Sequence, residues 1–470
     1  MAVTELQEAE EREGSPSPGG IGHLLLRHNS PLVQVSLVGL VCLCCPGMFN
    51  ALTGLGGGGQ LDHAAADNAN TALYACFAVF GVVGGGAYNL LGPRPTLALG
   101  ALAYPLYAAS FLYYSHRRSQ AFPVAAGSVL GVGAAFLWAA QGAVVTSYPP
   151  PGRRGAHISL FWCVFNLSAL GGLLPFFLNY HRDDDATRAA GSVNDATYVA
   201  FMAVMLLGAA LALLVLPPST IVRDDGARPT AFSFSSPATE AAETLRLFAG
   251  RRTLLLLPAA WASGFVHTYQ LNNVNGVLFT TRTRGLNTVF YGAAQMLGSA
   301  GIGWLLDLRL AGRRRRRGLA GVAVVSVLGA AVWGGGLANQ LRYRDGRWEE
   351  ELIDFKDGRR YAGPCLLYLS YGMLDAVFQS LIYWIIGALA DESQILSRYV
   401  GFFKGVQSAG AAVAWQVDTR HVPLMSQLIV NWALMTFSYP LLALLVFLAV
   451  KDEDNPVSSV EHGDDSDSKP

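Results

Sequence analysis

The stretch RRRRRGLAGVAVVSVLGAAVWGGGLA, residues 313–338, decides the fold class of this chain. After five arginines and one glycine come 20 residues, 319–338, that carry no charge. About 20 mostly apolar residues are what an α-helix needs to cross the hydrocarbon core of a bilayer. Basic residues beside such a helix favour the cytosolic side, where they contact anionic lipid. The stretch therefore predicts a transmembrane helix that begins in the cytosol.

Apolar stretches of similar length recur along the whole chain. Hydrophobic residues make up 52% of the sequence and charged residues 14%, compared with about 25% charged residues in a typical soluble protein. We predict an all-α membrane protein that crosses the lipid bilayer twelve times. The predicted spans are residues 32–52, 69–91, 96–115, 122–146, 156–179, 197–217, 253–275, 287–306, 319–338, 363–387, 397–416 and 423–449.

Composition and residue spacing exclude several classes of function. The formal net charge is 0, which does not indicate a nucleic-acid partner. The six cysteines show no metal-binding or redox spacing, and we predict that they are packing residues. Because no HExxH motif and no Ser/His/Asp set occurs, we expect no enzyme, no metal and no cofactor. The histidines His157 and His267 have no carboxylate at metal-ligand spacing, so we predict structural roles for both.

The longest polar connection and the loop charges predict the topology. Residues 218–252 divide the predicted spans six and six and include an amphipathic stretch near 238–248. If the N-terminus is cytosolic, 19 of the 33 lysines and arginines are cytosolic and 13 lie on the other side, six of these in the loop 339–362. Both termini are therefore predicted to be cytosolic. We predict a disordered N-terminus (1–30), a six-span half (31–217), a linker (218–252), a second six-span half (253–450) and a disordered acidic tail (451–470).

Two six-span halves joined by a linker are the plan of the major facilitator superfamily, in which the substrate path lies between the halves. A motif in the loop after the eighth predicted span agrees with this plan. Residues 301–314, GIGWLLDLRLAGRR, look like the loop signature of that superfamily. An acid at the end of a span can hold neighbouring helices by charge-assisted hydrogen bonds until the transporter changes state. The candidate residues of this cytosolic gate are Gly303, Asp307, Arg309, Gly312 and Arg313. Alternatively, the arginine run only anchors the cytosolic face. The counterpart segment, residues 88–95, lacks the acid.

Six segments, in this order, resemble the fungal Unc-ninety-three-like membrane proteins, a branch of the major facilitator superfamily. The segments begin at NLLGPR (89–94), WAAQG (138–142), NNVNG (272–276), Tyr291, Tyr371 and GFFKGVQSAG (401–410). The resemblance covers roughly residues 30–450 and implies a twelve-span facilitator bundle made of two six-helix halves. It implies no particular substrate, since some relatives look like regulators or trafficking escorts of other membrane proteins.

Two ionisable side chains lie at membrane depth. Asp375 is about 12 residues into its span, near mid-membrane at 1.5 Å per residue, and Gln379 follows one turn later on the same face. Lys404 is about seven residues into the next span, with Gln407 on the same face. Such residues are costly in lipid and indicate function by default. We predict that Asp375 and Lys404 face the bundle interior and pair in a cavity or coupling site. The alternatives are a pair that only fixes helix register, and a lysine that extends to the cytosolic interface.

Amide side chains provide further candidate cavity residues. Asn272 and Asn275, together with Gln270 and Asn273, lie late in the seventh predicted span, where they line a cavity or break the helix at a gate. Gln141 in the fourth span is another candidate. Ordinary hydrogen bonding between helices is the alternative for all of these amides.

The sequence thus predicts a secondary transporter of a small molecule or ion, working by alternating access between the halves. The alternative is a non-transporting regulator or trafficking escort of another membrane protein, with the same fold. The loop 339–362 is then a candidate contact surface, or otherwise a solvated hairpin. A single void lined by Asp375, Gln379, Gln407 and Asn275 would favour transport. The sequence favours neither the plasma membrane nor an internal membrane.

Overall fold

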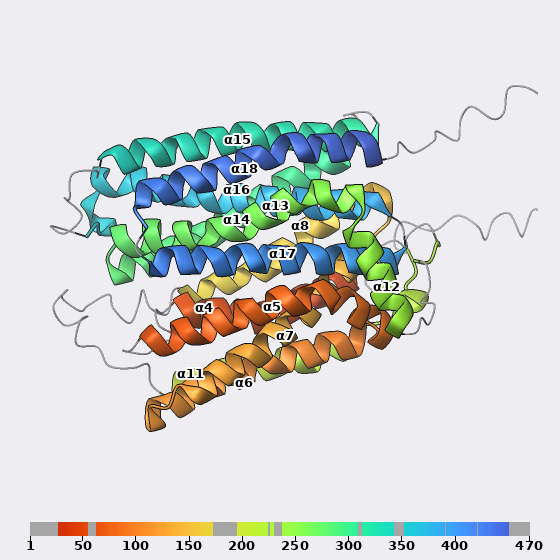
Figure 1. The fold of residues 1–470 in the computed structure, drawn as a ribbon, viewed down its shortest axis with the longest axis horizontal. Coiled ribbons are helices and arrows are strands. Elements are labelled where there is room, and N and C mark those ends of the chain that lie inside the picture. The colour runs from red at the N-terminus through yellow and green to blue at the C-terminus, as the bar shows by residue number, and fades with distance from the viewer. Residues whose placement is uncertain are drawn as a thin grey trace, which may run out of the picture.

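The protein is an elongated bundle of helices that lie side by side (Figure 1). The structure, a computed structural model, describes residues 27–54, 63–172, 195–223, 226–229, 237–308, 313–342, 352–390, 392–420 and 422–450. Within these ranges the β-structure consists of one isolated bridge between Phe279 and Ile353. The predicted all-α fold class is therefore confirmed.

The first six predicted spans coincide with helical segments of the structure. These segments are α3 (Pro31–Cys42) with η1 (Leu43–Gly47) and α4 (Met48–Gly54), α5 (His63–Leu91), α6 (Pro93–Arg117), α7 (Ala121–Ser147), α8 (Arg154–Asn166) with η4 (Leu167–Gly172), and α11 (Asp195–Ala212). Residues 173–179 of the predicted fifth span lie outside the described residues.

The last six predicted spans also coincide with helical segments. These are α13 (Arg251–Thr268) with η6 (Tyr269–Gly276), α14 (Thr281–Asp307), α15 (Arg314–Arg342), α16 (Arg359–Leu389), α17 (Ser393–Thr419) and α18 (Leu424–Ala449). Among the described helices, eight are long and apolar enough to cross a membrane. α13 and α17 are not among these eight; they carry His267, Lys404 and Gln407 of the site described below.

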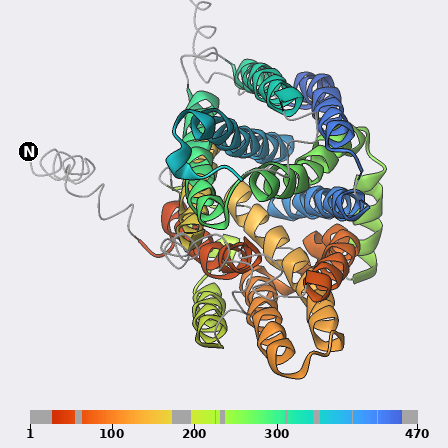
Figure 2. The same cartoon turned by 90° about the vertical axis from the view of Figure 1, so that its left-hand side faces the viewer.

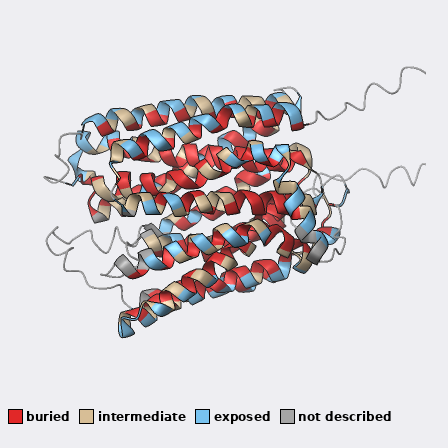
Figure 3. Ribbon diagram, in the orientation of Figure 1, coloured by how far each residue is buried: buried red, intermediate tan, exposed pale blue. Residues whose placement is uncertain are grey.

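The two sets of helices meet along a central surface, which we call the seam. In an end view, residues 31–212 (red to yellow) lie mostly on one side and residues 251–449 (green to blue) on the other (Figure 2). Buried residues concentrate on the inward faces of the helices (Figure 3). Glycines allow close approach at the seam: a Cβ on Gly85 of α5 would lie 2.6 Å from Cα of Arg398 on α17. Small residues at such contacts are typical of tightly packed membrane helices.

The predicted linker contains the short helices η5 (Pro218–Thr220) and α12 (Pro237–Phe248). α12 coincides with the amphipathic stretch predicted near 238–248, and it contacts α5, α13 and α17. The ring centroids of Phe248 and Phe402 are 5.1 Å apart. α12 therefore packs on helices from both sides of the seam at the end of the bundle where α13 begins (Figure 1).

At the opposite end of the bundle, residues 352–358 are fastened to the start of α14. The Oδ2 atom of Asp354 accepts hydrogen bonds from Nε of Arg282 over 2.6 Å and from the hydroxyls of Thr280 and Thr283 over 2.9 and 3.3 Å. The backbone N–H of Ile353 donates to the carbonyl of Leu278 over 2.8 Å. We call this arrangement the loop clasp. It shows that this part of the loop 339–362 is packed rather than a free solvated hairpin, whereas residues 343–351 lie outside the described residues.

Candidate functional site

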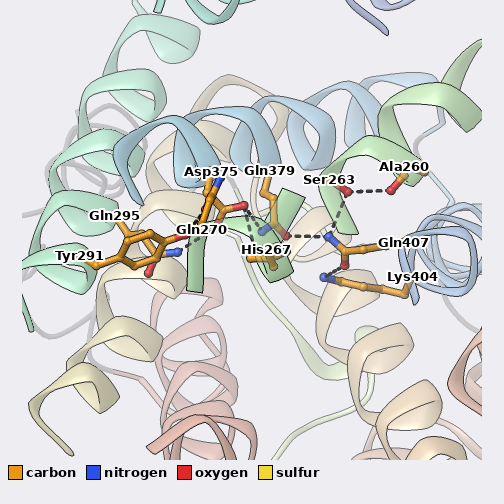
Figure 4. Close-up of polar contacts among 10 residues, drawn as sticks. All are labelled: Ala260, Ser263, His267, Gln270, Tyr291, Gln295, Asp375, Gln379, Lys404 and Gln407. Atoms are coloured by element: carbon orange, nitrogen blue, oxygen red, sulfur yellow. Dashed lines mark hydrogen bonds and ion pairs between the residues drawn. The ribbon is translucent and has the colours of Figure 1, made fainter. Parts of the chain in front are cut away.

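Asp375 lies near the middle of α16 and is 2% exposed. Its carboxylate contacts side chains from three helices (Figure 4). Nε2 of Gln379, on α16, donates to Oδ1 over 2.9 Å, and Nε2 of Gln295, on α14, donates to Oδ2 over 2.9 Å. Nε2 of His267, on α13, lies 3.2 Å from Oδ1. A buried charge needs such partners, because an uncompensated one is strongly destabilising.

The partner of Asp375 is His267, so the predicted direct pair with Lys404 is wrong. Nζ of Lys404 donates to Oε1 of Gln407 over 2.7 Å, and Nε2 of Gln407 lies 3.3 Å from Oε1 of Gln379, to which it donates. Gln379 then donates to Asp375, so two amides separate the lysine from the carboxylate (Figure 4). His267, for which we predicted a structural role, receives this carboxylate partner from another helix, because α13 packs against both α16 and α17. We call this set the central polar cluster: Ser263, His267, Gln295, Asp375, Gln379, Lys404 and Gln407.

Lys404 is 4% exposed, and its amine faces aromatic rings. Nζ lies 4.3 Å from the ring centroid of Trp138 on α7, 5.1 Å from that of Phe403 and 5.6 Å from that of Tyr383 on α16. Ring faces attract a cation at such distances. The alternative in which Lys404 extends to the cytosolic interface is therefore wrong. Because Trp138 and Lys404 belong to opposite sets of helices, the amine lies at the seam.

Gln141 of α7 lies on the other side of the seam and is fully buried. Its Oε1 accepts a hydrogen bond from the hydroxyl of Tyr383 over 3.0 Å, which links α7 to α16. Its Nε2 has no hydrogen-bond partner among the described residues, and neither has Nε1 of Trp162 on α8. The rings of Trp162 and Tyr383 are 6.3 Å apart. Gln141 therefore lies beside the central polar cluster and has a donor group that is not used.

Asn272 and Asn275 do not join the central polar cluster. They lie on η6, the π-helical continuation of α13. Nδ2 of Asn272 donates to Oδ2 of Asp418, near the end of α17, over 2.9 Å. Nδ2 of Asn275 donates to the carbonyl of Arg284 over 3.2 Å, and its Oδ1 accepts from Nδ2 of Asn287 over 3.0 Å. These amides therefore make hydrogen bonds between segments, which was the predicted alternative to a cavity role. They lie on a π-helical turn, a feature that is frequent at functional sites.

Asp307, at the end of α14, holds the first turn of α8. Its Oδ1 accepts from the backbone N–H of Gly155 over 2.9 Å and its Oδ2 from that of Ala156 over 2.6 Å. First-turn amides have no partner within their own helix, and the helix N-terminus carries partial positive charge, so a carboxylate there is stabilised. A Cβ on Gly303 would lie 2.8 Å from the carbonyl oxygen of Gly155. Arg313 is exposed, whereas residues 309 and 312 of the predicted motif, Arg309 and Gly312, lie outside the described residues.

The counterpart segment in the first set of helices makes neutral contacts with the first turn of α17. The hydroxyl of Tyr88 lies 3.2 Å from Oγ of Ser393. Nδ2 of Asn89 donates to the carbonyl of Gln394 over 3.2 Å, and Oγ of Ser397 donates to Oδ1 of Asn89 over 2.7 Å. At this end the seam is thus held by a charged contact through Asp307 and by neutral contacts through Tyr88 and Asn89.

His267 and Gln295 belong to the central polar cluster but were not among the residues predicted for the site. A helical pattern marks His267: Ser263, His267 and Gln270 recur at intervals of four and three residues and so share one face of α13. Gln295 lies four residues after Tyr291 on α14, and the hydroxyl of Tyr291 donates to Oε1 of Gln270 over 2.8 Å. Applying the same face rule to polar residues in every span would have selected both.

Two surface hollows among the described residues lie away from the central polar cluster. One, of about 390 Å³, lies between α15 and α16, and the other, of about 360 Å³, lies along the last turns of α17. They do not unite Asp375 with Asn275. The His267 side chain is nevertheless 33% exposed, so the cluster borders space that water can enter. Within the described residues no group of three or more His, Cys, Asp and Glu side chains could hold a metal ion.

The chain is similar to one protein family and to individual proteins of plants and fungi. A family model described as "Ion channel regulatory protein UNC-93" matches residues 58–332. UNC93-like protein 1 of Arabidopsis thaliana is 60% identical over 92% of this chain and 94% of its own length. UNC93-like protein C922.05c of Schizosaccharomyces pombe is 40% identical over 91% and 84%. The resemblance to Unc-ninety-three-like proteins is confirmed, but its restriction to fungi is not supported, since the plant protein is more similar than the fungal one.

Solved structures with a similar fold are transporters of the major facilitator superfamily. The fucose:proton symporter of Escherichia coli has a TM-score of 0.62, 12% sequence identity, and coverage of 90% of this chain and 98% of the symporter. A bacterial homologue of the iron transporter ferroportin, in its outward-facing state, has a TM-score of 0.58 with 11% identity, covering 88% and 98%. At these identities the likeness shows the fold alone.

Proposed function

The chain belongs to the UNC-93 family and has the major facilitator fold, and we propose that it is a secondary transporter coupled to protons through Asp375 and His267. The observation that carries this proposal is the contact between the buried carboxylate of Asp375 and the imidazole of His267. Both groups bind and release protons, and ionisable side chains inside a membrane mark proton and ion pathways.

Protonation of Asp375 would change the bonds that hold three helices together. The charged carboxylate accepts from Gln379 and Gln295. A protonated carboxyl group becomes a donor at one oxygen, so it can no longer accept equally at both. Loss of the bond from Gln295 would weaken the contact of α16 with α14, the helix that ends at Asp307. Proton binding in the cluster is thereby connected, along one helix, to the contact that closes the seam.

The proposed gate consists of the two contacts at the end of the seam, Asp307 with α8 and Asn89 with α17. Each joins a helix of residues 31–212 to a helix of residues 251–449. Arg154, at the start of α8, also donates to the carbonyl of Gly387 on α16. A change to a state open at this end must break these contacts together. Because the basic residues gather in the loops at this end, we place it, and both chain termini, in the cytosol.

The second candidate function is regulation or escort of another membrane protein without transport. One observation favours it: the matching family model is described as an ion channel regulatory protein. A regulator would use Asp375 and His267 only to hold its helices together. Its function would then require no change in the protonation of these two side chains.

Transport without a known substrate can be tested with a mixture of metabolites. The purified full chain is reconstituted in liposomes, supplied with a uniformly ¹³C-labelled yeast metabolite extract under an inward proton gradient, and the internal contents are identified by mass spectrometry. We expect at least one compound to accumulate only when both the protein and the gradient are present. Asp375→Asn should abolish this accumulation while exchange of the same compound without a gradient persists, because the substrate path remains.

The matched control is Asp195→Asn, since Asp195 is a carboxylate whose side chain is 52% exposed. It should accumulate the compound as the unmodified chain does. Accumulation by Asp375→Asn at the unmodified level would contradict the coupling role. A chain that is monodisperse in detergent and yet accumulates no compound would favour the regulator.

A further inference from the structure

Building on the proposed transport function, we propose that the solute is an organic monoanion that binds at the seam between the amine of Lys404 and unused donors on α7 and α8. The proposal names the class of substrate rather than the coupling step. It depends on the chemistry of the two walls of the seam, which belong to different sets of helices.

The first wall carries a cation without a carboxylate partner. Lys404 is buried, its hydrogen-bond acceptor among the described residues is Oε1 of Gln407, and no carboxylate lies within ion-pair distance of its Nζ in that part of the chain. Asp375, the acid in this cluster, already has contacts with His267, Gln379 and Gln295. The aromatic rings offset part of the positive charge, but an ammonium group with one neutral acceptor keeps unused donors and has no counter-ion. An anion at the seam would supply both the charge and the acceptors.

The second wall offers donors and lacks acceptors for them. Nε2 of Gln141, Nε1 of Trp162 and Nδ2 of Asn166 are buried, and none has a hydrogen-bond partner among the described residues. Gln141 bonds the hydroxyl of Tyr383 through its other atom, and the Trp162 ring also contacts Tyr383. Buried donors without acceptors are rare in native structures and call for an explanation. Oxygen atoms of a carboxylate would be suitable acceptors, whereas a cationic solute would leave these donors unused.

The aromatic rings between the two walls indicate the rest of the solute. Trp138, Phe403 and Tyr383 surround the lysine amine, and Phe165 lies next to Trp138 with ring centroids 5.7 Å apart. Such rings suit an apolar body attached to the acidic group. One lysine amine matches a single negative charge. A second charge on the solute would face the carboxylate of Asp375 without a cation of its own, so a monoanion fits better than a dianion.

The test uses the full chain in detergent micelles and measures its thermal unfolding with a thiol-reactive fluorophore, which buried free cysteines such as Cys42 and Cys45 make possible. The probes are the sodium salts of lactate, phenylacetate, cyclohexanecarboxylate and benzoate, each compared with its neutral amide at equal ionic strength. At saturating concentration at least one carboxylate should raise the unfolding midpoint above its amide by about 3 °C or more.

Two variants and a control make the result specific. Lys404→Gln should remove the difference between carboxylate and amide, whereas Lys356→Gln, at an exposed lysine of the loop clasp, should keep it. If Lys404→Gln does not fold, Gln141→Glu serves the same purpose, because it replaces an unused donor of the second wall by a negative charge while keeping the oxygen that Tyr383 bonds. The proposal is overturned if no carboxylate exceeds its amide, or if the excess persists in the variant that folds.

The outcome separates this inference from the proposed function. Suppose proton-driven accumulation depends on Asp375, but the compound that accumulates is neutral or cationic. The transport function then stands and the monoanion inference fails. If carboxylates stabilise the chain through Lys404 but nothing accumulates, the anion site stands and the transport function fails.

Discussion

Replacing Asp307 with asparagine should loosen the contact between α14 and α8 without unfolding either helix. The carboxylate accepts two backbone N–H groups, from Gly155 and Ala156. A hydrogen bond to a charged group contributes about 1.5–3 kcal/mol, and a charge at a helix N-terminus about 0.3–1 kcal/mol. Asparagine keeps one oxygen acceptor but loses the charge and one of the bonds. The contact should therefore weaken by about 2 kcal/mol, which corresponds to a population shift of about 30-fold.

Hydrogen exchange measured by mass spectrometry reports this shift directly, because the two amides that bond Asp307 are the ones that become exposed. We expect peptides that cover residues 151–158, in lipid nanodiscs, to exchange about 30-fold faster in Asp307→Asn than in the unmodified chain. Peptides from the middle of α11 should be unchanged, and so should every peptide of the control variant Asp195→Asn. Equal exchange at residues 155 and 156 in the variant and the unmodified chain would refute the reasoning. Faster exchange throughout the bundle would show general destabilisation instead of an opened gate.

Three further predictions concern the loop clasp and the seam. Burial alone would raise the pKa of Asp354, but the hydrogen bonds from Arg282, a backbone amide and a threonine hydroxyl, with the nearby positive charge, lower it below its ordinary value. The loop clasp should thus be stable at pH values above the ordinary aspartate pKa and should be lost as the pH falls through the lowered pKa of Asp354. Pepsin cleavage mapped to residues 352–358 would measure this loss. Arg282→Ala should move the loss to higher pH, and cleavage with an unchanged pH dependence would contradict the role of the arginine. Gly85→Val should prevent the close approach of α5 to Arg398, because even a Cβ would lie 2.6 Å from that Cα atom. The variant should elute from gel filtration as aggregate, or unfold at a temperature lower by about 1–3 °C, the shift expected for overpacking by about 1–3 kcal/mol in a chain of 470 residues.

The positions of the helices followed from local properties of the sequence. The stretch 319–338 has the length and composition of a span, and α15 (Arg314–Arg342) contains it. The amphipathic stretch of the linker likewise became α12. Length and hydropathy are properties of a single segment in contact with lipid, so they can be evaluated without knowledge of any other segment. The position of Asp375 along its helix could be predicted for the same reason. So could the faces, because Gln379 lies on the same helix face as Asp375, and Gln407 on the same face as Lys404.

The partners of these side chains depended on the arrangement of the helices. Asp375 and Lys404 are on consecutive helices, each pointing inward, and the sequence therefore favoured a direct pair between them. The packing of α13 against both helices brought His267 to the carboxylate instead, and the amides of Gln379 and Gln407 filled the space in between.

Sequence by itself predicted where the helical segments lie, the all-α fold class and the resemblance to the UNC-93 family. Only the tertiary structure decided that Asp375 meets His267 and that Lys404 faces Trp138 across the seam. The physical reason is that a contact between helices depends on the rotation and separation of both, to within the length of a hydrogen bond. Hydropathy constrains the rotation of a helix only to a broad face.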